Sequence, residues 1–540
     1  MNCKKVFSAA LLVQQILFCW AQAVPHIDPS HKENVPTCNV NADAAEARLA
    51  ARFRSGLRFA PPIGVTTYKL IVVRIDFGDL VMTKTKAQAE ELFSRFKSFY
   101  LENSYDQLTV DYTVSNFVFR MPQTHAYYRN GINSKYSELV TDAVDGAVAQ
   151  GIDFTTYDHI MIYHAGQGAE TASNTSQYIW SVYVSGSNAG KAGTGTIQGK
   201  TFHGATFVPE LEFSSVDPLG VTCHEYGHQQ GLPDLYENTS QSAVGVWSLM
   251  DFGIYTGSPR GSNPSHMDAW SKQFLGFSAP QTISVAQGVS KTLAKANANR
   301  TAFFRLPIGS SDIGSSNEYF LLEYRSKSGA TYDTALPGEG LLIWHVDDTI
   351  ASGSTHLANN DVNANSSRRG LDLVESDITD PSVNSGDSGD PWTSGSFSAP
   401  KANAYNGTSS GVELSIISGA TSSQMTFTLG NILNSSTDPG SGNATVTAGN
   451  HGYVNAKSNE KLAINVTPKT SGNFVMTIYT LTGVKIWQRT FSGTAEQRIA
   501  QEWDGKNDDG SVVASGIYIL HINGAGVNTV KKIAVLNKSN

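Results

Sequence analysis

The sequence predicts an α+β protein in which a mixed β-sheet with helices is followed by a β-rich extension and a C-terminal β-sandwich. Three observations support this prediction. Residues 68–77 form a β-branched apolar run suited to a central strand, residues 88–102 carry apolar side chains at helical spacing, and short alternating strands recur after residue 450. A strand, a helix and a strand in succession are typical of a mixed sheet with helices packed behind it.

The chain is long enough for several domains. With 540 residues, of which 40% are hydrophobic, it can form two or three domains with their own cores. Its formal net charge of −8 offers no basic surface for nucleic acid, so no nucleic-acid partner is expected. No segment is long and apolar enough to span a bilayer, and we expect the protein to act as a monomer.

The N-terminus has the pattern of a secretory signal. Two lysines precede an apolar run over residues 6–20, and small residues follow it. Cleavage is predicted after Ala23, so residues 1–23 are a predicted signal peptide and the mature protein should be exported to the extracellular space. Residues 24–64 are then a predicted pro-segment ahead of the first strand.

Residues 217–234 predict a short helix with a defined start and end. Asp217 can cap the first turn, and the proline after it suits the first helical position. Gly231 provides a left-handed cap, and a proline two residues later interrupts the backbone ladder. The helix should therefore stop near Gln230.

Within this helix, two histidines are placed to bind one metal ion. His224 and His228 lie four residues apart, so both imidazoles share a face at a separation that a tetrahedral Zn²⁺ can span. Gly231 turns the chain so that Asp234 can bring a carboxylate back to the ion, with Glu237 as the reserve candidate. Three protein ligands plus a water form the open pattern of catalytic zinc sites.

Glu225 is the predicted catalytic residue. It follows the first predicted ligand and lies beside the metal, where it can take a proton from a zinc-bound water whose pKa the cation has lowered. This arrangement predicts general-base hydrolysis. The alternative interpretation is an amphipathic core helix with two histidines that have ordinary hydrogen-bond partners.

The elements ahead of this helix are predicted from apolar periodicity. Besides strand 68–77 and helix 88–102, residues 108–119 and 159–164 have strand character. Residues 206–210 are expected to be an exposed edge to which an extended peptide could add as a strand, because a proline suits an edge position.

The chain after the helix divides into a closing helix and a β-rich part. Residues 267–277 are expected to close the catalytic core, which spans residues 65–278. Further strands are predicted at residues 317–325 and 338–347, within a β-rich part that spans residues 279–430.

These motifs resemble those of a known peptidase family. The His-Glu-x-x-His motif with Asp234, and the downstream turn from Trp247 to Met250, resemble the metzincin metallopeptidases and, within them, the immune inhibitor A-like family called peptidase M6. The resemblance covers residues 65 to 430 and implies a metzincin-like zinc peptidase domain, with Met250 as a hydrophobic floor under the metal. Further matching pieces are residues 75–79, 103–105 and 164–168 and Trp180.

The chain departs from the metzincin pattern at two positions. Many metzincins have a third histidine where this chain has Asp234. Some also have a zinc-facing tyrosine two residues after the methionine, where this chain has Phe252. Assistance by a phenol is then expected from another residue, for which Tyr255 is the candidate.

The mature chain is expected to keep two of the four cysteines, Cys38 and Cys223, so it is not a disulfide scaffold. A Cys38 thiolate in the pro-segment could occupy the open zinc position and hold the enzyme latent, as in the cysteine switch of matrix metallopeptidases. The alternatives are a disulfide between Cys38 and Cys223 or two inert thiols.

Acidic residues crowd a Gly- and Ser-rich region of the β-rich part. Clustered carboxylates suit Ca²⁺, a hard cation that exported proteins meet outside the cell. Structural calcium is implied by the family resemblance, without assigned ligands, and a solvated acidic loop is the alternative. The residues are Asp372, Glu375, Asp377, Asp380, Asp387 and Asp390.

The C-terminal part has its own organisation. Residues 431–449, rich in Asn, Ser, Thr, Gly and Pro, are a predicted linker, and residues 450–540 contain the strands of the predicted β-sandwich. The pattern from Trp503 to Gly510 resembles the Ig-like module of bacterial exported proteins, similar to the flagellar-hook-capping type and to secretion-sorting domains. The resemblance implies contact with the secretion machinery, a surface or substrate adhesin, or a stabilising spacer.

Together these patterns predict a secreted zinc metalloendopeptidase that hydrolyses extracellular proteins and peptides. The alternative is a non-catalytic surface adhesin built on a protease fold, against which Glu225 argues because a dead copy needs no base. A small-molecule amidase with the same metal ligands is a third hypothesis.

Overall fold

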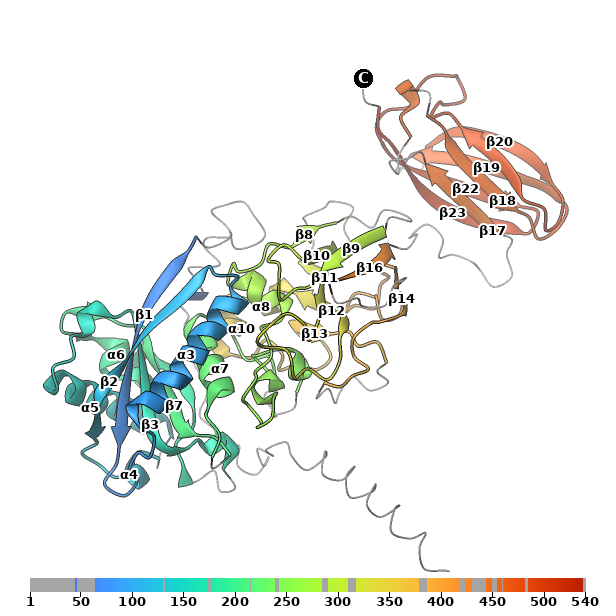
Figure 1. Ribbon diagram of the computed structural model, residues 1–540. Coiled ribbons are helices and arrows are strands. Elements are labelled where there is room, and N and C mark those ends of the chain that lie inside the picture. Colours follow the sequence, from blue (N-terminus) through green and yellow to red (C-terminus); the bar gives the residue numbers. More distant parts are fainter. Residues whose placement is uncertain are drawn as a thin grey trace, which may run out of the picture. The chain divides into compact units, whose positions relative to one another are not determined.

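The computed structural model describes residues 44–45 and 64–537, with gaps at 130–131, 173–176, 214, 238–241, 284–289, 309–316, 378–385, 417–422, 430–442, 449–453, 459 and 481–483 (Figure 1). The predicted signal peptide and most of the predicted pro-segment, including Cys38, lie outside the described residues. The chain divides into two compact units. The first contains residues 1–283, 292–393 and 418–425, and the second contains residues 284–291, 394–417 and 426–540.

A mixed five-stranded sheet forms the centre of the first unit, with the strand order β2-β1-β3-β7-β4. The pairs β1–β2, β1–β3 and β3–β7 are parallel, whereas β4 runs antiparallel to β7, so the predicted mixed sheet is confirmed. The strands are β1 (Thr66–Asp76), β2 (Leu108–Arg120), β3 (His159–Gln167), β4 (Val182–Ser185) and β7 (Gly204–Leu211).

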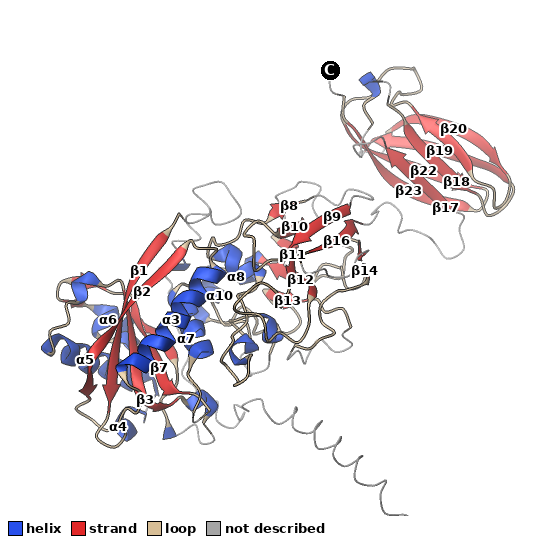
Figure 2. Ribbon diagram, in the orientation of Figure 1, coloured by secondary structure: helices blue, strands red, loops and turns tan. Residues whose placement is uncertain are grey.

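Helices cover both faces of this sheet (Figure 2). Leu70 and Val72 of β1 pack in one hydrophobic cluster with α3 (Lys86–Asn103) and α7 (Leu219–Gln229). The alternate side chains of β1 pack in a second cluster with α5 (Ile132–Ala149). Because both faces of β1 are buried, this strand needs the continuous apolar run from which it was predicted.

The predicted helix 88–102 is observed as α3, and its start has a local cause. The Thr85 side chain accepts a hydrogen bond from the backbone N–H of Gln88 (3.3 Å), and the Gln88 side chain accepts one from the backbone N–H of Thr85 (2.9 Å). This capping box satisfies two amides at the helix start. Helix α3 therefore begins two residues earlier than its apolar periodicity indicates.

The prediction of an exposed edge at residues 206–210 is wrong. These residues belong to β7, which pairs with β3 on one side and with β4 on the other. Strand β4 is the edge strand at this end of the sheet, with no further strand beside it among the described residues. The proline pattern was misleading because β4 comes from a segment that was not assigned as a strand.

A β-rich part follows, and the two strands predicted in it are confirmed as β11 (Glu318–Arg325) and β12 (Gly340–Asp347). They belong to a five-stranded sheet with the order β13-β12-β11-β10-β8, next in the chain to a four-stranded sheet with the order β14-β15-β16-β9. The other strands are β5 (Thr196–Ile197), β6 (Lys200–Thr201), β8 (Gln281–Thr282), β9 (Ser290–Ala294), β10 (Phe303–Pro307), β13 (Leu371–Leu373), β14 (Gly395–Phe397), β15 (Leu414–Ile416) and β16 (Gln424–Leu429).

Short helices connect these elements. Helix α8 follows the metal-site region where a closing helix was predicted, and α10 precedes β13. The short helices are α4 (His125–Arg129), α6 (Lys191–Thr194), α8 (Ala269–Phe274), α9 (Asp348–Ala351) and α10 (Ser354–Asn359). No helix in the described part of the chain combines the length and the apolar character that crossing a bilayer requires.

The C-terminal strands form two antiparallel sheets with the orders β17-β18-β21 and β20-β19-β22-β23. Side chains from both sheets meet in one hydrophobic cluster that includes Leu462, Trp503 and Leu520. Strand β17 lies within the predicted linker and pairs with β18, because Thr445, Val446 and Thr447 have high strand propensity. The strands are β17 (Asn443–Ala448), β18 (Leu462–Thr467), β19 (Gly472–Thr480), β20 (Lys485–Gly493), β21 (Ile499–Trp503), β22 (Gly516–Gly524) and β23 (Val527–Val535).

Candidate metal centre

Helix α7 carries the predicted metal ligands, but its start differs from the prediction. Asp217 does not cap the helix: its carboxylate pairs with Lys84 (2.8 Å) and Arg95 (2.7 Å). The N-cap position is Pro218, which has no side-chain capping bond. The two cations come from segments more than a hundred residues away, so local spacing contained no sign of this competition.

The end of α7 agrees with the prediction. Its last residue is Gln229, and Gly231 follows with φ of +95°. The backbone N–H of Leu232 donates to the carbonyl of Gly227 (3.0 Å), which closes the turn after the helix. Glycine is needed here for a second reason, because a Cβ at Gly231 would lie 2.9 Å from the backbone nitrogen of Ala45.

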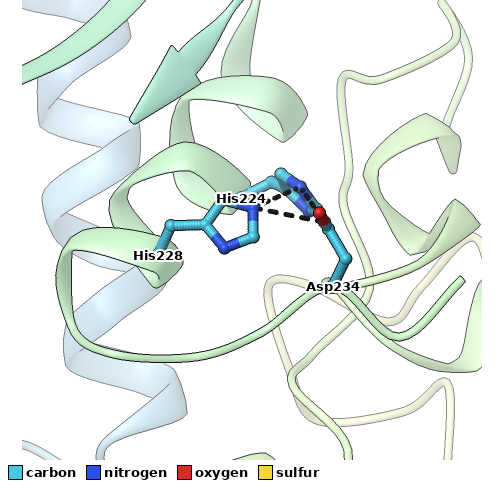
Figure 3. A group of neighbouring side chains, drawn as sticks. All are labelled: His224, His228 and Asp234. Atoms are coloured by element: carbon cyan, nitrogen blue, oxygen red, sulfur yellow. Dashed lines mark hydrogen bonds and ion pairs between the residues drawn. The ribbon is translucent and has the colours of Figure 1, made fainter. Parts of the chain in front are cut away.

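Three of the predicted residues, His224, His228 and Asp234, meet in a compact triad (Figure 3). The two Nε2 atoms are 3.2 Å apart, and Oδ1 of Asp234 lies 3.1 Å from Nε2 of His224 and 3.2 Å from Nε2 of His228. The three residues are 3%, 0% and 4% exposed. The residues present therefore fit a metal ion, since three ligand atoms of suitable chemistry converge away from bulk solvent.

The other ring nitrogen of each histidine points to a backbone carbonyl. Nδ1 of His224 is 3.0 Å from the carbonyl oxygen of Leu249, and Nδ1 of His228 is 2.8 Å from that of Leu232. A carbonyl oxygen only accepts, so each Nδ1 carries the proton in these bonds. Each Nε2 can then offer a lone pair, which is the tautomer that binding a metal requires.

The buried carboxylate of the triad needs a positive partner. Burial alone would raise the pKa of Asp234, but the neighbouring His228 and His224 bring this pKa well below its usual range. Oδ1 of Asp234 accepts no well-aligned hydrogen bond within the described part of the chain. A buried carboxylate oxygen in this state is stabilised by a proton on a neighbouring ring or by a bound metal ion.

Glu225 lies on the same helix and is 4% exposed. Burial raises the pKa of its carboxyl to about 8, and the charges of Asp234 and Glu170 act in the same direction. The charge of His224 and the backbone N–H of Tyr183, in edge strand β4, lower it. The carboxyl is therefore close to the triad and next to the outermost strand of the sheet.

Glu237, the reserve candidate for the third ligand, is not part of the triad. Its Oε1 lies 2.6 Å from Nη2 of Arg369, and both side chains are buried. Arg369 also pairs with Asp372 (2.6 Å). The structure therefore brings Asp234, and not Glu237, to the two histidines.

The methionine predicted to lie under the metal packs against α7. A Cβ at Gly227 would lie 2.7 Å from Sδ of Met250, so glycine at this helix position allows the close approach. Tyr255 ends the 3₁₀ helix η7 (Phe252–Tyr255). Burial raises the pKa of its hydroxyl well above the usual value, and the charges of Glu212, Glu170 and Glu225 add to this, so the phenol stays protonated.

Three of the six predicted acidic residues form a second group of possible ligands. Carboxylate oxygens of Asp377, Asp387 and Asp390 lie within 4.8 Å of one another. Asp390 is buried and accepts a hydrogen bond from the indole N–H of Trp247 (2.6 Å). Burial raises the pKa of nearby Glu375 to about 9. Asp380 lies outside the described residues.

Sequence reasoning missed one residue at the triad. Nδ2 of Asn360 donates to Oδ2 of Asp234 (2.5 Å), and Oδ1 of Asn360 accepts from the backbone N–H of Asp234 (2.7 Å). The two residues are 126 positions apart. The only signal was an asparagine after a short helix, which is common in proteins of every function.

The part of the chain that holds the triad matches a known family. The family model described as Immune inhibitor A peptidase M6, catalytic domain, matches residues 154–279. The pre-pro-metalloprotease PrtV of Vibrio cholerae serotype O1 (strain M66-2) is 34% identical over 128 residues, which cover 22% of this chain and 14% of PrtV. Immune inhibitor A of Bacillus thuringiensis subsp. alesti is 29% identical over 218 residues, which cover 33% of this chain and 31% of that protein.

The similarity is limited in extent. The chain spans 14% of the length of PrtV and 31% of the length of Immune inhibitor A. Among solved structures, FlgD from P. aeruginosa is 18% identical, covering 17% of this chain and 71% of that chain, but its TM-score of 0.13 supports no argument about the C-terminal module. Residues 154–279, which hold the triad and Met250, are thus similar to the catalytic domain of the immune inhibitor A-like peptidases, peptidase M6.

Proposed function

We propose that this chain is a secreted zinc-dependent endopeptidase with Glu225 as its general base. The observation that carries the proposal is the buried triad of His224, His228 and Asp234 with Glu225 beside it. Two imidazoles and one carboxylate are a ligand set of catalytic zinc sites, which keep one position open for water or substrate. Metzincin-like geometry of the core is part of this proposal.

The proposed mechanism divides the work among four residues. His224, His228 and Asp234 would hold zinc, which when bound acts as a Lewis acid that lowers the pKa of water and polarises the scissile carbonyl. Glu225 takes the proton of the attacking water and returns it to the leaving amine. Burial raises the pKa of this carboxyl to about 8, and the positive charge of a bound metal ion would lower it again, so that the ionised form is available as a base near neutral pH.

Substrate binding is proposed at strand β4. An extended peptide can add to a strand at the end of a sheet as a further strand. Tyr183 of β4 donates its backbone N–H to Glu225, so a peptide on this strand would lie next to the catalytic carboxyl. The hydroxyl of Tyr255, which stays protonated, is the proposed donor to the oxygen that becomes negative during attack.

Structural calcium is proposed at the group of Asp377, Asp387 and Asp390. Carboxylate-only groups suit hard cations such as Ca²⁺. The raised pKa of Glu375, to about 9, reflects burial together with neighbouring negative charges, which a bound cation would neutralise. The calcium ion would take no part in hydrolysis and would stabilise the loops that carry these residues.

Export, latency and the C-terminal module remain predictions from the sequence. The predicted signal over residues 1–23 and Cys38 lie outside the described part. Cys38 is predicted to be a switch, the partner of Cys223 or an inert thiol. Cys223 is buried, and burial raises the pKa of its thiol well above the usual value. Intact mass and zinc content of protein purified from culture medium test export, processing and metal loading together.

Glutamine at position 225 tests the mechanism. Glu225→Gln keeps the shape of the side chain but removes the base, so casein hydrolysis should fall by roughly 10²–10⁴-fold, with zinc content unchanged. Glu91→Gln, an exposed glutamate on α3, is the matched control and should hydrolyse casein at the wild-type rate. Wild-type activity in the Glu225→Gln or Glu225→Ala variant would show that the zinc mechanism is wrong.

The same assay separates the competing functions. A non-catalytic surface adhesin would load zinc or bind protein without hydrolysing casein in the wild-type form. A small-molecule amidase would hydrolyse short amides but leave proteins and peptide libraries intact. Cleavage of internal peptide bonds in a library by the wild-type protein, and not by Glu225→Gln, is the result expected of an endopeptidase.

A further inference from the structure

Asn360 holds Asp234 at two points. Its Nδ2 donates to Oδ2 of the Asp234 carboxylate (2.5 Å), and its Oδ1 accepts from the Asp234 backbone N–H (2.7 Å). One amide group therefore orients both the backbone and the carboxylate of this residue. Oδ1 of Asp234, which faces the two imidazoles, is left available (Figure 3).

The backbone conformation of Asn360 suits this role. It follows α10 in the left-handed region, with φ of 55° and ψ of 45°. Asparagine and glycine occupy this region more readily than other residues, and asparagine alone of the two has an amide. Aspartate would adopt the same backbone conformation but would place a carboxylate oxygen against Oδ2 of Asp234.

The three triad residues differ in what orients them. His224 and His228 donate to the backbone carbonyls of Leu249 and Leu232. A side-chain substitution leaves these carbonyls in place. Asp234 depends on the side chain of Asn360, so among the three it is the residue whose orientation a single distant substitution can change.

Two further contacts come from the same distant segment. Nδ2 of Asn363 donates to the carbonyl of Leu235 (2.7 Å), and Arg369 pairs with Glu237 (2.6 Å). We call Asn360, Asn363 and Arg369 the clasp. The clasp contacts three residues of the loop that follows α7, and Oδ1 of Asn363 accepts from the backbone N–H of Leu371 at the start of β13 (3.1 Å), which ties this loop to the second sheet.

We propose that Asn360 is a positioning residue for the third metal ligand, so that the clasp, which lies outside the family match over residues 154–279, completes the metal centre. This inference rests on the proposed function, because it assigns Asp234 as a ligand. Without the Asn360 amide, Oδ2 loses its donor and the carboxylate gains freedom to rotate. Loss of an outer-shell partner of this kind typically weakens metal affinity by 10–100-fold.

Zinc affinity of the full-length protein is the direct test. Metal-free protein is titrated with Zn²⁺ against a chromogenic chelator, for the wild type and for Asn360→Gly and Asn360→Asp. Both variants should bind Zn²⁺ about 10–100-fold more weakly. Asn359→Gly and Asn359→Asp are the matched controls, since Asn359 is the exposed neighbour of Asn360 on α10 and does not contact the triad. The controls should bind Zn²⁺ with wild-type affinity.

A double-mutant cycle separates positioning from general stability. In an Asp234→Asn background, where the third ligand is already lost, Asn360→Gly should weaken Zn²⁺ binding no further. A merely structural role would instead lower the melting temperature of the metal-free protein and leave Zn²⁺ affinity unchanged. Circular dichroism checks that each variant is folded. If the glycine variant unfolds, the test uses Asn360→Asp, which retains the side-chain size and the backbone preference.

The outcomes are distinguishable. Wild-type Zn²⁺ affinity in both Asn360 variants, or equal losses in the Asn359 controls, would overturn the inference while leaving the proposed function intact. Failure of the wild-type protein to bind Zn²⁺ would overturn the proposed function first. Weaker binding confined to the Asn360 variants, and absent from the Asp234→Asn background, supports the positioning role.

Discussion

Two groups of possible metal ligands in this chain are built in opposite ways. The triad is buried, and its residues lie within eleven positions on one helix and the loop after it. The acidic group of Asp377, Asp387 and Asp390 has two exposed members and comes from loops on both sides of residues 378–385. Imidazole with carboxylate suits zinc, whereas carboxylate alone suits a hard cation. The ligand set suited to zinc is thus the buried one, and the ligand set suited to a hard cation is the more exposed one.

The two groups also differ in electrostatics. In the triad, two histidines bring the pKa of the Asp234 carboxyl well below its usual range. In the acidic group, burial raises the pKa of Asp390 to about 6 and that of neighbouring Glu375 to about 9. The triad therefore contains groups that balance its negative charge, whereas the acidic group gains most from an added proton or cation.

The largest expected difference between the two groups appears when one residue of each is substituted. His228→Ala removes a ligand of the triad, so zinc binding and casein hydrolysis should fall by more than the roughly 10–100-fold that loss of an outer-shell partner costs. Asp387→Asn removes a carboxylate of the acidic group and should leave both quantities unchanged. Zinc content by elemental analysis and a casein assay measure the two variants side by side.

The reverse pattern would contradict the assignment. If Asp387→Asn removed zinc while His228→Ala kept it, the acidic group would be the zinc site. Equal losses in both variants would indicate that the two groups depend on each other for folding, and the separate roles given to them here would be wrong.

The role proposed for Tyr255, whose hydroxyl is affected by the charge of Glu225, can be tested by a single substitution. Tyr255→Phe removes one hydroxyl and keeps the ring against which Arg260 packs (4.7 Å from its guanidinium carbon to the ring centroid). Removing one donor to a developing oxyanion lowers kcat by about 10²-fold or more. We expect this loss in kcat with KM and zinc content near wild-type values. An unchanged kcat would mean that the phenol takes no part in the reaction.

The triad could be predicted from the sequence because its determinants are local. Spacing on a helix places His224 beside His228, and the turn at Gly231 returns Asp234 to them, so no distant part of the chain is needed for the pattern. The central strand β1 was also predictable, since burial on both faces requires a continuous apolar run.

The errors and omissions have the opposite origin. Asp217 was expected to cap α7, but Lys84 and Arg95 reach it from 133 and 122 residues away. Asn360 contacts Asp234 across 126 residues, and no spacing rule connects such positions. Partners that fold topology brings together leave no periodic mark on the sequence, so the outer shell of the site was missed although its ligands were found.

Trp247 contacts the acidic group and is close in sequence to the triad, and its substitution should have the next largest effect, on the free energy of unfolding. Its indole N–H donates to the carboxylate of Asp390, and Leu249, two residues later, orients His224. Trp247→Phe should lower the free energy of unfolding by about 1.5–3 kcal/mol, the value of a hydrogen bond to a charged group, plus the cost of the smaller ring. Urea unfolding of the zinc-loaded protein measures this change.

A second tryptophan is the matched control for this prediction. The indole of Trp392 donates to the backbone carbonyl of Val374 (2.8 Å), which is a neutral acceptor. Trp392→Phe should therefore cost less, about 0.5–1.5 kcal/mol for the bond. A larger loss at Trp392 than at Trp247 would show that the bond to Asp390 contributes nothing beyond packing.

The smallest predicted effect concerns the acidic group and pH. A carboxyl whose pKa is higher in the folded than in the unfolded chain binds its proton more tightly when folded, so its contribution to stability is present at low pH and is lost as pH rises through the folded pKa. For Asp390 this loss develops from 3.8 to about 6, and for Glu375 from 4.5 to about 9, so the loss between pH 6 and pH 9 comes from Glu375. Zinc-loaded protein without calcium should therefore melt at a lower temperature at pH 9 than at pH 6, by roughly 2–4 °C for each kcal/mol lost. Calcium should reduce this decrease because the cation replaces the protons, and Asp387→Asn should weaken the calcium effect. Identical melting curves with and without calcium at pH 9 would show that these carboxylates form no cation site.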